Sequence, residues 1–167
     1  AAFCDTVEVS ITLGCTDPGA LNYNTLANTD DGSCIYDCSI FAISIDSLEN
    51  VSTNNLNENK IVKRTKHLNS LKKYLERGEF PININFEDRK PVFVDEENTH
   101  CAVAYLLKEN KKDFIVNQIV NLHNYDYISD MNTELLNNWI ETSGLTLGEL
   151  KLIQPTYDRR RRNEGIY

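Results

Sequence analysis

No hydrophobic run in the 167-residue sequence is long enough to span a bilayer. The longest apolar segment, from Cys101 to Leu107, falls far short of the roughly eighteen residues that a membrane helix needs. Positive charge is also scarce, with 17 Lys and Arg residues against 25 Asp and Glu residues and a net charge of −8. This balance argues against general binding to nucleic acids or anionic membranes, because both require a cationic surface.

Motifs for several common chemistries are missing as well. There is no phosphate-binding glycine loop, no Gly-x-Ser-x-Gly nucleophile elbow and no Cys-x-x-Cys pair of the kind found in zinc sites. A cleavable signal peptide is not visible, but the chain begins with two alanines. Such a start is typical of a chain trimmed after a small-residue cleavage site, and it predicts a secreted protein.

Cysteines are concentrated near the N-terminus. Four of the five, Cys4, Cys15, Cys34 and Cys38, precede residue 39, and Cys101 stands alone in an apolar segment. Clustered cysteines without nearby histidines indicate disulfides formed in an oxidising compartment. We expect Cys15 to bond Cys34, because this bridge would close a loop that has no core, and Cys4 to bond Cys38 as the remaining pair.

Two segments near the N-terminus alternate between apolar and polar residues. Residues 5–13 and 39–46 are apolar at every second position, which predicts two half-buried strands. The loop between them would join a long hairpin or cross over between parallel strands. Cys4 and Cys38 both precede their strands, which favours the parallel arrangement, and the sequence leaves the two topologies open.

Composition divides the chain into four parts. A disulfide-rich β/loop module covers 1–48, an Asn-rich linker covers 49–59, a helical domain covers 60–157, and a basic tail covers 158–167. The fold class predicted is therefore α+β, with a mainly helical domain preceded by a small disulfide-stapled module.

The helical domain carries residues that begin or end helices. Gly78 is expected to end the first helix, Thr146 and Glu149 to form a capping box, and Pro155 to stop the last helix. About five helices are predicted from these signals and from the apolar spacing. They cover 61–76, 100–110, 113–123, the stretch from Asp130 to Gly144 and the stretch from Thr146 to Pro155.

Two details of this domain are predicted more closely. The segment 100–110 is apolar all round and should be the central helix, whereas residues 80–86 and 91–95 should be short extended pieces that form a β-hairpin or two edge strands. The first helix should bury one stripe of side chains, consisting of Ile61, Thr65, Leu68, Leu71 and Leu75.

The segment from Gly14 to Cys34 follows the pattern G-C-x-D-x-x-A-x-N-Y-x-x-x-A-x-x-D-D-G-S-C. It resembles a short repeat in secreted proteins of marine bacteria and algae. The resemblance implies an extracellular, disulfide-bearing module that looks like the calcium loops of thrombospondin type 3 repeats. Calcium prefers oxygen ligands, and the same residue types also favour turns, so both interpretations stay open. The candidate ligands are Asp17, Asn22, Asn24, Asn28, Asp30 and Asp31.

Five motifs lie between Lys66 and Tyr157. They are H-L-x-x-L-x-x-Y at 67–74, G-x-F-P-x-N at 78–83, P-V-F-V-D at 91–95, C-A-V-A-Y-L at 101–106 and W-x-x-x-S-G-L-T-x-x-E-x-x-x-I-Q-P-x-Y at 139–157. This part of the chain resembles a family of uncharacterised exported bacterial proteins. The resemblance implies export and assigns no activity.

One constellation could support catalysis. Cys101 follows His100 at the start of the predicted central helix, and His67 and His123 lie elsewhere in the chain. A helix N-terminus lowers the pKa of a thiol, and a histidine from another element can act as the base. The alternative is that Cys101 is a reduced, buried core residue. The sequence favours a protein that is not an enzyme.

Other residues are candidates for modification or for contact with partners. Asn50 begins an N-glycosylation sequon, and Thr6 and Ser47 lie in Asp-Thr-Val and Asp-Ser-Leu tripeptides that resemble acceptors of a bacterial O-glycosylation system. An alternating terminal strand can add to the sheet edge of a neighbour, and a run of arginines can bind an acidic surface. The expected contact residues are Val7, Val9, Ile11, Arg159, Arg160, Arg161 and Arg162.

The leading functional hypothesis is an extracellular structural or interaction protein. It would be a subunit of a cell-surface or filamentous assembly, with other protein subunits as partners. One alternative is a secreted cysteine-dependent hydrolase. Another is a calcium-dependent carbohydrate-binding module, which would present an aromatic surface drawn from Tyr74, Tyr105, Tyr125, Tyr127, Trp139 and Tyr157.

Overall fold

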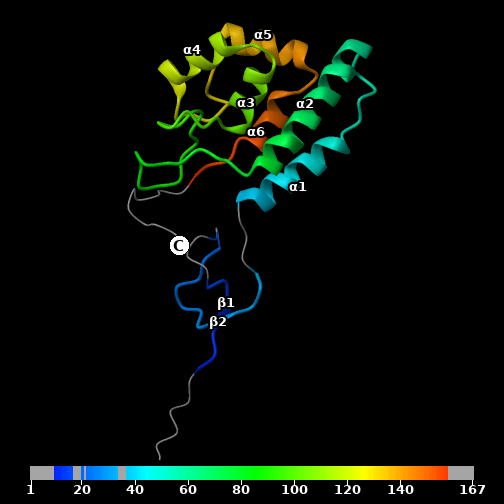
Figure 1. Cartoon of the computed structure of the whole chain (residues 1–167). Coiled ribbons are helices and arrows are strands. Elements are labelled where there is room, and N and C mark those ends of the chain that lie inside the picture. Colours follow the sequence, from blue (N-terminus) through cyan, green and yellow to red (C-terminus); the bar gives the residue numbers. More distant parts are fainter. Residues whose placement is uncertain (1–9, 17–19, 21, 34–36, 158–167) are drawn as a thin grey trace, which may run out of the picture. The chain divides into compact units, whose positions relative to one another are not determined.

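A computed structural model describes residues 10–16, 20, 22–33 and 37–157, without the side chains of 37–40. Within this part of the chain, two short strands are followed by six helices (Figure 1). The chain separates into two compact units, Ala1–Ile40 and Phe41–Tyr167, and the division falls inside the first helix. The mainly helical α+β fold predicted from the sequence is confirmed.

The N-terminal unit contains a two-stranded parallel sheet. Strand β1 (Leu13–Gly14) pairs with strand β2 (Thr29–Asp30), and Leu13 lies opposite Thr29. The side chain of Asn28 extends this pairing, because its Oδ1 accepts from Thr12 N at 3.0 Å and its Nδ2 donates to Ser10 O at 2.7 Å. Side-chain hydrogen bonds therefore supplement a ladder of only two residue pairs.

The predicted second strand at 39–46 is wrong, because these residues belong to helix α1 (Asp37–Glu49). Alternation of Phe41, Ile43 and Ile45 suits a strand, but Phe41, Ile45 and Leu48 also follow helical spacing. The helix buries the side chains of Phe41, Ile45 and Leu48, and it leaves Ile43 66% exposed. Neither of the two expected topologies forms, since both required a strand at 39–46.

Helix α2 (Glu58–Arg77) ends at Gly78 as the sequence predicts, but it begins three residues before the expected start at Ile61, inside the stretch predicted as a linker. The side chain of Asn57 caps its start by accepting from Lys60 N, and Gly78 ends it with φ 66, a left-handed conformation that glycine adopts without strain. The buried stripe differs from the expected one: Ile61 and Thr65 are exposed. The residues that face the core are Arg64, His67, Leu68, Leu71 and Tyr74.

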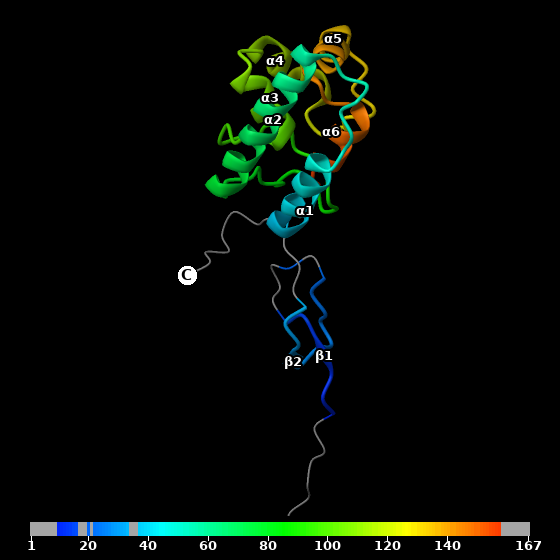
Figure 2. The same cartoon turned by 90° about the vertical axis from the view of Figure 1, so that its right-hand side faces the viewer.

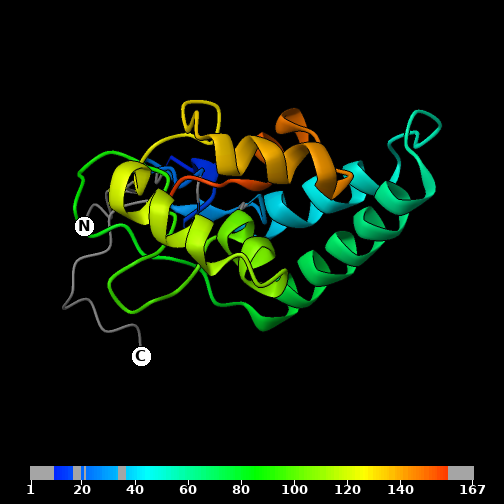
Figure 3. The same cartoon turned by 90° about the horizontal axis from the view of Figure 1, so that it is seen from above.

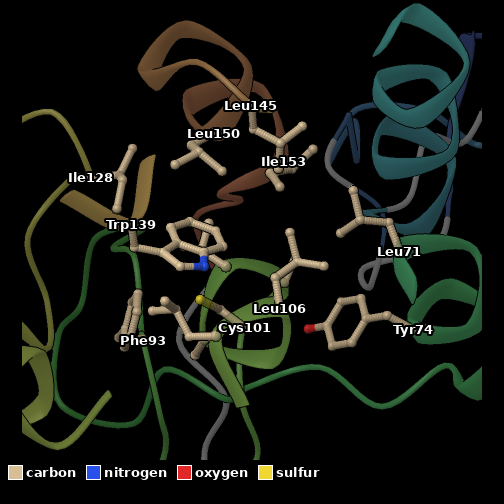
Figure 4. Packing of buried hydrophobic residues seen from close by; sticks show 14 of the residues in the cluster. Leu71, Tyr74, Phe93, Cys101, Leu106, Ile128, Trp139, Leu145, Leu150 and Ile153 are labelled. Carbon is tan, nitrogen blue, oxygen red and sulfur yellow. The ribbon is translucent and has the colours of Figure 1, made fainter. Parts of the chain in front are cut away.

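The prediction of a central helix is confirmed. Helix α3 (Ala102–Glu109) contacts α2, helix α4 (Asp113–His123) and helix α6 (Leu147–Ile153). It lies between α2 and α4 in Figure 1 and in the view from above in Figure 3. Five of its eight residues are buried, so it forms the middle of the core shown in Figure 4.

Helix α5 (Glu134–Ser143) and helix α6 complete the helical unit, which Figure 2 shows from the side. Thr133 caps α5 by accepting from Leu136 N, so the predicted cap at Asp130 is wrong. Thr133 is the capping residue because Glu134 is the first helical residue, and Asp130 lies in the preceding turn. The predicted capping box of Thr146 and Glu149 is confirmed.

The predicted hairpin between 80–86 and 91–95 does not form. Lys90 pairs with Tyr157 and Val94 pairs with His100, each as an isolated antiparallel bridge. Pro81 and Pro91 lack the N–H groups that a ladder needs. The segments are fixed instead by their own polar side chains and by contacts with distant residues.

Buried amide side chains organise these loops. Asn83 is fully buried, and its Nδ2 donates to the carbonyl oxygens of Phe86, Asp88 and Tyr157. Asn124 bonds both backbone groups of Val94 in the same manner. Such amides replace the backbone partners of a sheet, so an irregular chain keeps its buried polar groups satisfied.

Within the described part of the chain, every helix is too short or too polar to cross a membrane.

Candidate functional site

Cys101 is the N-cap residue that precedes α3, and it lies in the core. The thiol is free and only 1% exposed, and Figure 4 shows its sulfur among apolar side chains that include Trp139. Burial raises the pKa of this thiol to about 12, although the backbone of Ala104 and Val103 favours the thiolate. The prediction of a reduced, buried core residue is confirmed. A thiol that stays protonated argues against a role as nucleophile.

The three candidate histidines form separate contacts. The Nδ1 atom of His100 bonds to a carbonyl of the loop before it at 2.8 Å, and the Nδ1 atom of His123 lies 2.8 Å from Asp126 Oδ2. His67 is buried in α2. Within the described part of the chain, none of these hydrogen bonds reaches the thiol of Cys101, so the expected cysteine–histidine pair is not assembled.

A buried ion pair that the sequence reasoning missed joins α2 to α6. Arg64 Nη2 lies 2.6 Å from Glu149 Oε1, with both side chains less than a tenth exposed. Burial alone would raise the pKa of Glu149, but hydrogen bonds from Arg64 and Thr146 and the charge of Arg64 outweigh it and lower that pKa. The carboxylate is thus held ionised inside the helical unit.

Arg64 also satisfies backbone carbonyls at the ends of two other helices. Its Nη2 donates to Leu48 O at 2.7 Å, and its Nη1 donates to Gly144 O at 3.1 Å. One guanidinium therefore ties α2 to residues that end or follow α1 and α5. Arginine suits this role, because its planar group offers several donors in fixed directions.

Gly144 allows α5 to end close against α2. Its φ is 81, and a Cβ atom placed there would lie 2.2 Å from Lys60 O. Both the left-handed backbone and the close approach require glycine. The sequence identified Gly144 as a helix end, and the structure adds the contact that fixes the residue type.

His67 lies at the contact between α2 and α5. Its ring centroid is 5.6 Å from that of Trp139, with 53° between the ring planes. Burial lowers the pKa of His67, and the charges of Lys66 and Lys63 add to this effect. Asn110 and the backbone of Ser143 oppose it without reversing it. The ring is therefore neutral at pH 7.

The expected calcium ligands that are described take part in turns of the N-terminal unit. Asn24 Oδ1 accepts from Leu26 N at 3.0 Å, and Asp31 Oδ1 accepts from Ser33 N at 2.9 Å. The hydrogen bond to Ser33 lowers the pKa of Asp31. Asp30, Asn22 and Asn28 are also hydrogen-bonded. Among the described residues no group of three acidic, histidine or cysteine side chains could hold a metal ion, and Asp17 lies outside them.

The expected disulfides fall partly outside the described residues. Cys15 is buried and disulfide-bonded. Cys4, Cys34 and the side chain of Cys38 are not described, so the pairing of Cys15 with Cys34 stays a prediction.

The expected modification sites differ in exposure. Asn50 and Ser52 of the sequon are exposed, and Asn50 Nδ2 donates to Asp46 O at 2.9 Å. Ser47 is exposed on α1, but Leu48 of the same tripeptide is 1% exposed. Thr6 lies outside the described residues.

Of the expected partner contacts, only Ile11 is described. It is 71% exposed, and Leu13 two residues later is 61% exposed. Val7, Val9 and the arginines at 159–162 lie outside the described residues. The expected aromatic surface does not assemble, because Tyr74, Trp139 and Tyr157 are buried.

Comparison of the chain with protein-family models, curated proteins and solved structures found no match.

Proposed function

We propose that the protein is an extracellular interaction subunit that joins other protein subunits in a cell-surface or filamentous assembly. The observation that carries the proposal is the exposure of Ile11 and Leu13, at 71% and 61%, along an extended segment. Residues two apart on an extended chain point to the same face. The pair therefore presents an apolar ridge that contact with a partner would cover.

Two further observations support the proposal. The disulfide at Cys15 suits an oxidising, extracellular compartment. The buried, protonated thiol of Cys101 disfavours the alternative of a cysteine-dependent hydrolase. With β2 on one side only, β1 also retains an edge within the described part of its sheet, and such an edge can accept a strand from a neighbour.

The experiment compares the mass of the full chain with that of two variants at matched concentration and salt. We expect wild-type mass to rise with concentration, and the Ile11→Lys, Leu13→Lys double variant to stay monomeric. The matched control is Ile43→Lys, which changes an isoleucine of α1 that is 66% exposed and should leave association unchanged. A wild-type chain that is monomeric at every concentration, in solution and by electron microscopy, would refute self-association.

A further inference from the structure

His67 carries a buried imidazole at the contact between α2 and α5. Its side chain lies on the core face of α2, and the residue is 1% exposed. Neither Nδ1 nor Nε2 makes a hydrogen bond of normal geometry to any described residue. Buried polar atoms are nearly always paired, so an unpaired ring in a well-packed core calls for an explanation.

The surroundings of this ring contain apolar, uncharged polar and positively charged groups. Trp139 of α5 packs against it, and Lys63 and Lys66 are the charged groups that act on it from α2 itself. The side chain of Asn110, at the end of α3, and the backbone of Ser143 of α5 lie close enough to favour the protonated ring, although neither makes a hydrogen bond of normal geometry to it. Within the described part of the chain no carboxylate is among the groups acting on the ring, and Glu149 of α6 is paired with Arg64.

We propose that His67 is an acid-sensitive latch between α2 and α5. The neutral ring packs against Trp139, and a proton on the ring separates the two helices. The proton would place a charge in a buried site near two lysines, with no acidic partner to balance it. The packed arrangement therefore excludes the imidazolium, and an opened arrangement admits it because the ring reaches water.

The direction of the pH effect follows from which state binds the proton. An opened state exposes a histidine with its ordinary pKa of 6.5, whereas the packed state holds a lower pKa. The opened state thus binds more protons below pH 6.5. As the pH falls, the equilibrium constant for opening therefore rises by up to about tenfold per pH unit, until the pH reaches the lowered pKa of the packed state. Packing by the neutral ring is fully effective above pH 6.5.

Neighbouring contacts define what an opening between α2 and α5 would have to break. Lys63 Nζ donates to Thr142 O at 3.0 Å, and Arg64 Nη1 donates to Gly144 O, two residues further along the chain, at 3.1 Å. The ion pair of Arg64 and Glu149 holds α6, and the lowered pKa of Glu149 keeps this pair intact until the pH falls below the ordinary value of 4.5. Mild acid therefore acts on the α5 contact before it acts on the α6 contact.

The single tryptophan of the chain provides the measurement. Fluorescence of Trp139 and its quenching by acrylamide are recorded for the full chain between about pH 7.5 and about pH 5. We expect acrylamide access to Trp139 to increase below pH 6.5 in the wild type. The His67→Gln variant, which keeps a polar side chain but cannot titrate there, should show no such increase.

His100 supplies the matched control, because burial also lowers its pKa. The His100→Gln variant should retain the pH response of Trp139. A response that persists in His67→Gln, or that disappears only in His100→Gln, would overturn the proposal. If His67→Gln fails to fold, the ring of His67 is titrated in the wild type by NMR. A ring that titrates at its ordinary pKa without any change at the Trp139 indole would equally refute the latch.

Discussion

The two units of the chain are stabilised by different means. In the N-terminal unit only Cys15 and Ala20 are buried among its described residues, and the chain is held by a disulfide and by side-chain hydrogen bonds such as those of Asn28. The helical unit buries a continuous apolar cluster from Phe41 to Ile153. Covalent closure thus replaces a core in one unit, whereas burial supplies most of the stability in the other.

The largest effect should come from the buried ion pair of the helical unit. Arg64→Met leaves Glu149 charged and buried and frees two carbonyl oxygens, so it should lower the free energy of unfolding by about 3–5 kcal/mol. Chemical denaturation followed by Trp139 fluorescence measures this loss. Lys72→Met is the control, because the pair of Lys72 and Glu49 is largely exposed and is worth about 0–1 kcal/mol.

Equal losses in the Arg64 and Lys72 variants would show that the buried pair has no special weight. The double variant Arg64→Met, Glu149→Met should recover part of the loss, because it removes the uncompensated charge.

A second prediction tests which periodicity of α1 matters. Ile45→Ala removes a core side chain that is 2% exposed, and it should destabilise the helical unit by about 2–5 kcal/mol. Ile43→Ala changes a residue that is 66% exposed and should alter stability by no more than about 0.5 kcal/mol. Equal effects at both positions would contradict the helix and restore the predicted strand.

The smallest effect on the helical unit should come from reduction of the disulfide. A reductant should increase protease cleavage between Ser10 and Ser33, since little else closes this region. The unfolding of the helical unit should not change, because its core begins at Phe41. Parallel melting curves with and without reductant, followed at Trp139, check this. Peptide mapping of the oxidised chain tests whether Cys34 is the partner of Cys15.

Local signals predicted the helices well where the cap and the spacing agree. Gly78, Thr146 and Glu149 act as expected, because capping depends on only a few neighbouring residues. The strand prediction at 39–46 failed because that stretch fits both periodicities. Extending the count to Leu48, which is buried, would have favoured the helix.

The main polar contacts of the core were harder to foresee. Arg64 and His67 occupy helical spacing with Leu71, so the stripe could have been placed one position earlier along α2. Charged and polar residue types argued against that placement. Their burial depends on partners far along the chain, namely Glu149 and Trp139, which no local pattern of α2 reveals.

Helix α1 has a consequence for anyone who divides this protein by truncation. The composition of the sequence suggests a cut near residue 49 or residue 60, at the Asn-rich stretch. Such a cut would discard Phe41, Ile45 and Leu48, which are all buried in the helical core, and would remove the carbonyl of Leu48 that Arg64 binds. A shortened version that keeps its fold and solubility should therefore start upstream of Phe41, with α1 retained in full.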